Sequence, residues 1–289
     1  MTIANYDQQI EKRYHPENFI KGEILKKPKK AKARKATKAK SSKKPKKVLA
    51  KYQVVRKEID DSHYYWINDE FVPATTEILG VAGPVEYGLR TFWQNNSASD
   101  ANKIVEEAKE FGSLIHDSIE RLLLGDTLNL EELASVMPNY KKDFKKHIMS
   151  FYDWFYAFKP DLDSIKTELV VGSKKYKFGG TVDLFCKKDG KAWIVDFKTS
   201  AGIYLSHKMQ LAAYKIAFQE YTGQKVDKVA ILRTGSKHKA GYEFKEVEED
   251  YKDAFVNVYN VYLAMNDGKL PQPPEVVVYP KELSLYEKN

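Results

Sequence analysis

The order of elements in the second half of this chain restricts its fold more than any other feature. Alternating hydrophobicity predicts three strands, then a helix and a further strand, and Asp189-Gly190 between the second and third strands is typical of a tight hairpin. Hairpins join antiparallel strands, whereas a helix between strands favours parallel pairing, so we expect a mixed sheet flanked by helices. These elements are expected at 165–171, 178–187, 192–199, 205–221 and 226–233.

The segment before these strands has mainly helical periodicity. Apolar residues recur at helical spacing over 101–124, and a second helix over 139–158 is ended by Pro160. With short helices expected near 75–79 and 85–95, the predicted fold class is α/β, with an αβββαβ core and N-terminal helical additions. A strand and turn at 63–71, a strand at 242–247 and a helix at 249–266 complete the prediction.

The basic residues are concentrated in one segment. Residues 26–47 contain 13 Lys or Arg and no acidic residue, so the remainder has 35 basic against 40 acidic residues. Without large apolar side chains this segment cannot offset its ordering entropy, and we expect it to be disordered. We favour a tail that contacts nucleic acid, with a linker or a localisation signal as alternatives. The predicted division is 1–25 N-terminal segment, 26–48 Lys-rich tail, 49–270 folded domain and 271–289 Pro-rich tail.

Composition excludes several classes of protein. No apolar run approaches the roughly 18 residues of a membrane span, and the N-terminus lacks the apolar core of a secretory signal. We therefore expect a protein of the cytoplasm or nucleoid, in the host cytoplasm if phage-encoded, that is neither secreted nor bound to a membrane. The single Cys186 cannot form an internal disulfide or supply the ligands of an iron–sulfur cluster.

Three charged residues stand out on the predicted strands. Asp196 and Lys198 lie two apart in IVDFKT and share one face, and Asp183 is set among apolar residues in GGTVDLF. If the two strands form a hairpin across 189–190, Asp183 faces Asp196. Two carboxylates in that position repel unless a cation lies between them, and hard oxygen ligands suit Mg²⁺ or Mn²⁺. The alternative is a structural acid–lysine pair.

Other polar residues give weaker signals. Gln210 and Tyr214 share one face of the helix that follows, and Gly112 lies one turn before His116, where close backbone approach would explain a helical glycine. Taken alone, each of these residues, like Glu168 on the first core strand, has an ordinary structural interpretation.

The residues in series resemble the motifs of RecB-type nucleases in the PD-(D/E)XK superfamily, a branch that includes phage exonucleases and the mitochondrial genome maintenance exonuclease. The motifs occur in family order over about 100 residues, and the αβββαβ order matches the family core. The PD dipeptide is replaced by Val182-Asp183, and the cysteine quartet of the iron–sulfur subgroup is missing. The matching series is Gly112-x-x-x-His116, Glu168, Gly180-x-x-Asp183, Asp196-x-Lys198 and Gln210-x-x-x-Tyr214.

The resemblance implies a role for each of these residues. Lys198 would orient the attacking water, Gln210 and Tyr214 would position the DNA strand or support the site, and Glu168 has the least certain role. One or two Mg²⁺ or Mn²⁺ ions are implied, and no iron–sulfur cluster. The implied metal ligands are His116, Asp183, Asp196 and the backbone carbonyl of Phe197.

The predicted function is that of a metal-dependent deoxyribonuclease. The resemblance favours an exonuclease on single-stranded or end-containing DNA, in recombination, repair or phage DNA processing, and a recombination or replication protein as partner. The alternatives are a structure- or sequence-specific endonuclease and a catalytically silent DNA-binding module, because a fold alone does not fix the substrate. The intact Asp183, Asp196 and Lys198 argue against the silent module.

Overall fold

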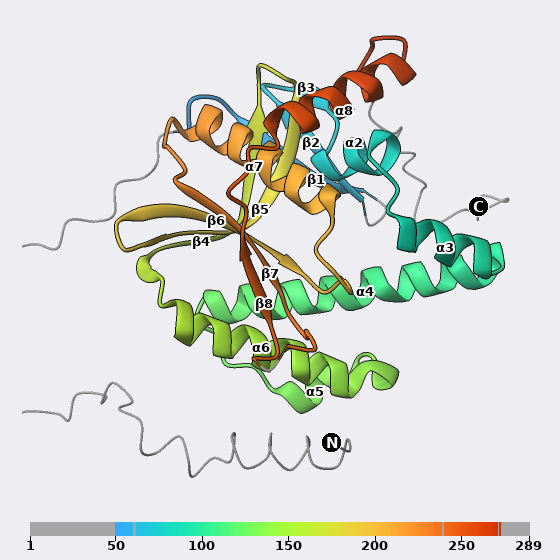
Figure 1. Ribbon diagram of the computed structural model, residues 1–289. Helices are drawn as coiled ribbons and strands as arrows, with labels where there is room; N and C mark the ends of the chain where they lie inside the picture. The colour runs from blue at the N-terminus through green and yellow to red at the C-terminus, as the bar shows by residue number, and fades with distance from the viewer. Residues whose placement is uncertain (1–49, 60–61, 239, 271, 273–289) are drawn as a thin grey trace, which may run out of the picture. The chain divides into compact units, whose positions relative to one another are not determined.

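The structure is a computed structural model that describes residues 50–59, 62–238, 240–270 and 272 (Figure 1). All of them belong to one compact unit, Lys47–Asn289. The predicted N-terminal segment (1–25) and Lys-rich tail (26–48) lie outside the described residues, as does the predicted C-terminal tail (271–289) apart from residue 272. The division of the chain at these points stays a prediction.

A five-stranded mixed sheet with the order β4-β5-β6-β7-β8 forms the centre of the domain. The first three strands pair antiparallel, β6 and β7 run parallel, and β8 returns antiparallel. The predicted α/β class and its αβββαβ order are therefore confirmed. The strands are β4 (Asp161–Ser173), β5 (Phe178–Lys188), β6 (Lys191–Lys198), β7 (Lys228–Arg233) and β8 (Glu243–Glu246).

The tight turn between β5 and β6 sets the register of the two strands that carry the predicted acids. Asp189 and Gly190 have φ angles of 51° and 73°, and a two-residue turn with positive φ at both positions fits the right-handed twist of the strands. The ladder runs from Lys188↔Lys191 to Leu184↔Val195, in the register that the sequence predicts.

Helices cover both faces of the sheet (Figure 1). Over one face lie α2 (Thr75–Ala82), α7 (Leu205–Thr222) and α8 (Lys252–Met265). Over the other lie α4 (Ala98–Leu123), α5 (Leu130–Ser135) and α6 (Lys141–Phe158). Of these, α5 lies in a segment for which no element is predicted. The 3-10 turn η2 (Pro138–Tyr140) lies at the start of the helix predicted over 139–158. Within the described residues, no helix is both long enough and apolar enough to cross a lipid bilayer.

Each face of the sheet has its own hydrophobic core, because successive side chains of a strand point to opposite faces. Ile194 packs in the core beneath α7 and α8, whereas Val195 and Phe197 pack in the core against α4 and α6. Burial of each large side chain, such as Trp154 at 1% exposure, contributes roughly 1.5–3 kcal/mol. The sequence predicts that Asp196 and Lys198 share one face of the strand, and by the same alternation this is the face of α7.

The N-terminal part contains the predicted helical additions and also a small sheet, of which only the strand and turn at 63–71 are predicted. Besides α2 and α3 (Tyr87–Asn95) it contains a three-stranded antiparallel sheet of β1 (Val54–Ile59), β2 (Ser62–Ile67) and β3 (Glu70–Val72). The first strand, VVRKEI, was missed because its charged residues break the alternation of apolar and polar positions. This sheet packs closely on β5, where a Cβ at Gly179 would lie 2.5 Å from Tyr65.

Candidate active site

The β5–β6 ladder opens at Asp183. Leu184↔Val195 is its last pair, and beyond it the N–H of Phe197 donates to Oδ2 of Asp183 at 2.6 Å. A carboxylate thus takes the place of the next backbone acceptor, so the expected direct pairing of Asp183 with Asp196 is not part of the ladder. The contact fixes the Asp183 side chain between the two strands.

Asp183 lies in a cluster with a histidine and a second carboxylate. His116 from α4, Glu168 from β4 and Asp183 each offer a ligand atom, and these atoms all lie within 4.8 Å of one another. The Nδ1 of His116 is 3.6 Å from Oδ1 of Asp183. Burial alone would raise the pKa of Asp183, but the neighbouring His116 and Lys198 hold it below its usual value. This donor set suits a divalent cation of the Mg²⁺ or Mn²⁺ type.

Glu168 reaches this cluster through an unusual backbone conformation. Its φ angle is +46°, a left-handed conformation that is costly for a strand residue with a side chain and that tends to occur at functional sites. Arg56 of β1 pairs with its carboxylate at 3.2 Å. Burial and the charge of Asp183 nevertheless raise the pKa of Glu168 to about 7. Sequence reasoning missed Arg56, because no local pattern connects it to a strand so far along the chain.

Asp196 is a buried carboxylate with incomplete partners. It is 1% exposed, and Nζ of Lys198 lies 2.7 Å from its Oδ2. Apart from this ion pair, neither Asp196 oxygen has a hydrogen-bond partner among the described residues. Burial raises the pKa of Asp196 to about 6. Buried acceptors of this kind need a further partner, and a cation fulfils that need.

The helix α7 supplies the remaining predicted residues. Nε2 of Gln210 donates to the hydroxyl of Tyr214 at 2.7 Å. Tyr214 is buried against Gly180, where a Cβ would lie 2.6 Å from the ring, so this glycine makes room for the tyrosine. Burial, together with the charges of Asp196 and Asp183, raises the pKa of Tyr214 well above 10 and keeps its hydroxyl protonated.

Gly112 does not show the expected close approach. A Cβ at this position would lie 3.6 Å from Oγ1 of Thr199, which is an ordinary van der Waals contact.

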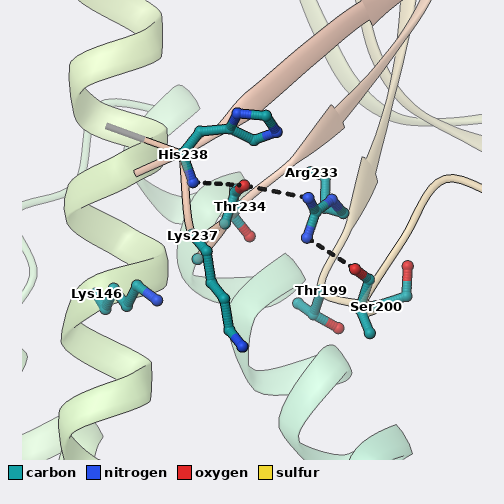
Figure 2. A pocket seen from close by; sticks show the side chains of 10 residues that line it. Lys146, Thr199, Ser200, Arg233, Thr234, Lys237 and His238 are labelled. Carbon is teal, nitrogen blue, oxygen red and sulfur yellow. Dashed lines mark hydrogen bonds between the residues drawn. The ribbon is translucent and has the colours of Figure 1, made fainter. Parts of the chain in front are cut away.

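Sequence reasoning missed a cleft in the neighbourhood of Thr199. An open cleft of about 460 Å³ begins directly after Lys198 (Figure 2). It is lined by Lys146, Thr199, Ser200, Ala201, Arg233, Thr234, Gly235, Ser236, Lys237 and His238.

Comparisons with known proteins find similarities to nucleases. A family model described as the PD-(D/E)XK nuclease superfamily matches residues 85–275, a range that includes every predicted site residue. The CRISPR-associated exonuclease Cas4 of Francisella tularensis subsp. novicida is 31% identical over 104 residues, which cover 36% of this chain and 51% of the relative. The chain thus spans about half the length of that relative. A solved structure of an inferred exonuclease from Eubacterium rectale has a TM-score of 0.43 and 15% identity, over 74% of this chain and 91% of the other.

Proposed function

Since this chain belongs to the PD-(D/E)XK nuclease superfamily, we propose that it is a metal-dependent deoxyribonuclease that degrades DNA from its ends, with a preference for single strands. Family membership makes it a nuclease. The metal, the substrate and the mode of attack are the proposal. The observation that carries it is Asp196, a buried carboxylate beside the His116–Glu168–Asp183 cluster whose oxygens have Lys198 as their one charged partner within the described residues.

The residues present fit a divalent cation. His116, Asp183, Asp196 and the carbonyl of Phe197 would hold one or two Mg²⁺ or Mn²⁺ ions, with Glu168 in reach of the same site. A cation bound there would polarise the scissile phosphate and lower the pKa of an attacking water. Its positive charge would also relieve the repulsion between carboxylates that burial otherwise makes costly.

Lys198 would act on the attacking water and the phosphate rather than on the metal. Its ammonium is held by Asp196 at 2.7 Å and is 17% exposed, so it remains accessible to substrate. In that position it would orient the attacking water and stabilise the negative charge that develops on the phosphate. Gln210 and Tyr214, which are hydrogen-bonded to each other, would position the strand or support the site.

Two features support action on DNA ends. The Francisella relative is an exonuclease, and the motif series resembles the RecB-like branch. The Lys-rich segment at 26–47 would add sequence-independent contacts with phosphates. A role in recombination, repair or phage DNA processing, with a protein partner from that process, follows from the same resemblance and belongs to the proposal.

The test is digestion of end-labelled linear single strands, linear duplexes and circular single strands of DNA, with Mg²⁺, Mn²⁺ or EDTA. We expect linear strands to be degraded only with metal, while circles survive. Lys198→Ala should abolish cleavage but retain binding of Mn²⁺, because it removes a transition-state charge and no ligand. Lys191→Ala, at the exposed start of the same strand, is the matched control and should cleave normally.

Each alternative has its own outcome. Cleavage of circles would indicate an endonuclease. Binding of DNA without cleavage under any metal condition would indicate a silent DNA-binding module and would refute the proposal, as would full activity in EDTA.

A further inference from the structure

The cleft beside the candidate active site lies where the parallel strands β6 and β7 end. Thr199, Ser200 and Ala201 follow β6 directly, and Thr234 to His238 follow β7. The carboxyl ends of parallel strands are where α/β sheets bind ligands, because the connecting loops diverge there. Since Lys198 is the last residue of β6, whatever occupies the cleft lies next to the proposed cleavage site.

The loop after β7 is held rigidly by α6. Nδ1 of His147 lies 2.7 Å from Oγ1 of Thr234, and the N–H of Gly235 donates to Oγ of Ser150 at 3.0 Å. Gly235 has a φ angle of +63°, and a Cβ there would lie 2.2 Å from Nε2 of His147, so only glycine fits. The loop is therefore organised before any ligand binds.

Arg233 joins the two sides of the cleft rather than offering a free charge. It donates to the Ala201 carbonyl at 3.0 Å and to Oγ of Ser236 at 3.1 Å, and it pairs with Glu243 at 2.7 Å. Glu243 therefore neutralises Arg233, and it also lies 3.8 Å from His238. These contacts assign Arg233 and Glu243 to the frame of the cleft.

Two lysines remain without such a partner. Lys146 on α6 is half-buried and Lys237 is exposed, and across the described ranges no ion pair neutralises either of them. Figure 2 shows Lys146 at one side of the view and Thr199 and Ser200 at the other, with the side chain of Lys237 between them. The cleft thus carries a positive charge that the acidic side chains around it do not cancel.

The hydroxyl groups of the cleft add donors. Ser236 is 2% exposed, and its Oγ accepts hydrogen bonds from Arg233 and from the N–H of His238, so its own hydrogen is left to donate. Thr199 has no hydrogen-bond partner for its hydroxyl within the part of the chain that the structure describes. Two ammonium groups with hydroxyl donors form the kind of site that binds a phosphate.

We propose that this cleft binds a phosphate group of the nucleic-acid strand, through Lys146, Lys237, Thr199 and Ser236. The phosphate is either an internal one next to the cleaved bond or the terminal 5′-phosphate of the strand. The inference rests on the proposed nuclease function and adds to it a site that positions the strand. It assigns this task to residues outside the motif series.

The test measures binding of fluorescent single-stranded oligonucleotides, with a 5′-phosphate or a 5′-hydroxyl, in EDTA and at several salt concentrations. Lys146→Gln combined with Lys237→Gln should weaken binding roughly tenfold or more, because charged hydrogen bonds are lost. The salt slope should fall by about 0.7 for one phosphate on a single strand. Thr199→Val should weaken binding a few fold with an unchanged slope. The matched control is Lys252→Gln combined with Lys269→Gln, and it should bind like the unmodified protein. Both lysines are exposed, Lys252 at the start of α8 and Lys269 beyond its end.

The two sources of phosphate give different results. If the unmodified protein prefers the 5′-phosphate oligonucleotide and the Lys146/Lys237 variant does not, the cleft binds a terminal phosphate. If the variant binds both oligonucleotides more weakly by the same factor, the cleft binds an internal phosphate. If the Lys146/Lys237 variant matches the control in affinity and slope, the proposal is overturned. Because binding is measured without metal, that result is distinct from a failure of the unmodified protein to cleave DNA.

Discussion

Acid should destabilise this protein through His147, which supports the loop of the cleft. The side chain is 8% exposed, and Nδ1 lies 2.7 Å from Oγ1 of Thr234. Burial, followed by the charges of Lys146 and Arg233, lowers the pKa of His147 from 6.5 to about 4. A protonated His147 would place an unpaired charge beneath the loop and favour unfolding.

The sign and size of the effect follow from this shift. A histidine with a lower pKa in the folded protein than in the unfolded chain contributes full stability above pH 6.5, and that stability is lost as the pH falls toward 4. At about 1.36 kcal/mol per pKa unit, the complete loss is about 3 kcal/mol, and most of it is lost by pH 4.5.

Urea unfolding at pH 7.5 and pH 4.5, for the unmodified protein and for His147→Asn, measures this contribution. The asparagine amide keeps a polar group near Thr234 but does not titrate. The variant is less stable at pH 7.5. On acidification to pH 4.5 its free energy of unfolding should fall by about 2–3 kcal/mol less than that of the unmodified protein. His63 and His207 titrate in both proteins and cancel in the difference. His238→Asn, in the exposed part of the loop, is the control. Equal losses for His147→Asn and the unmodified protein would refute the reasoning.

Four further results are expected. Lys198→Ala should lower the cleavage rate at saturating DNA by at least about 100-fold, and a normal rate in single-turnover assays would remove Lys198 from the mechanism. His116→Ala should raise the Mn²⁺ concentration for half-maximal activity by at least about tenfold, so overlapping metal titrations would exclude it as a ligand. Gly180→Ala should cost roughly 1–3 kcal/mol in denaturant unfolding, because its Cβ would lie 2.6 Å from Tyr214, and an unchanged midpoint would contradict this contact. Deleting residues 1–47 should flatten the salt dependence of DNA binding with little change in the catalytic rate, and an unchanged slope would leave this segment as a linker or localisation signal.

Local pattern alone predicted the arrangement of the core. The hairpin at Asp189-Gly190 and the alternation along β6 depend on φ preferences and on which face of a strand is apolar, and both can be read from neighbouring residues. Asp196 and Lys198 were therefore placed on one face before any tertiary contact was known. The fold class and the order of elements followed in the same way.

Contacts between distant segments could not be predicted in this way. Glu168 enters the cluster through a left-handed backbone conformation and pairs with Arg56, and no periodicity indicates either feature. The opening of the ladder at Asp183 depends on a side chain that replaces a backbone acceptor.

The cleft, too, could not be predicted from the sequence, because three distant segments form it. The segment after β6, the loop after β7 and the helix α6 are far apart in the chain, and each alone has the composition of an ordinary polar loop or helix surface. The sequence by itself determined the strands and the helix that carry the motif residues, because periodicity and turn preferences act between near neighbours. Only the tertiary structure decided which distant charges meet at Asp183, Asp196 and the cleft, because those contacts depend on how the elements pack and on which groups packing leaves buried without partners.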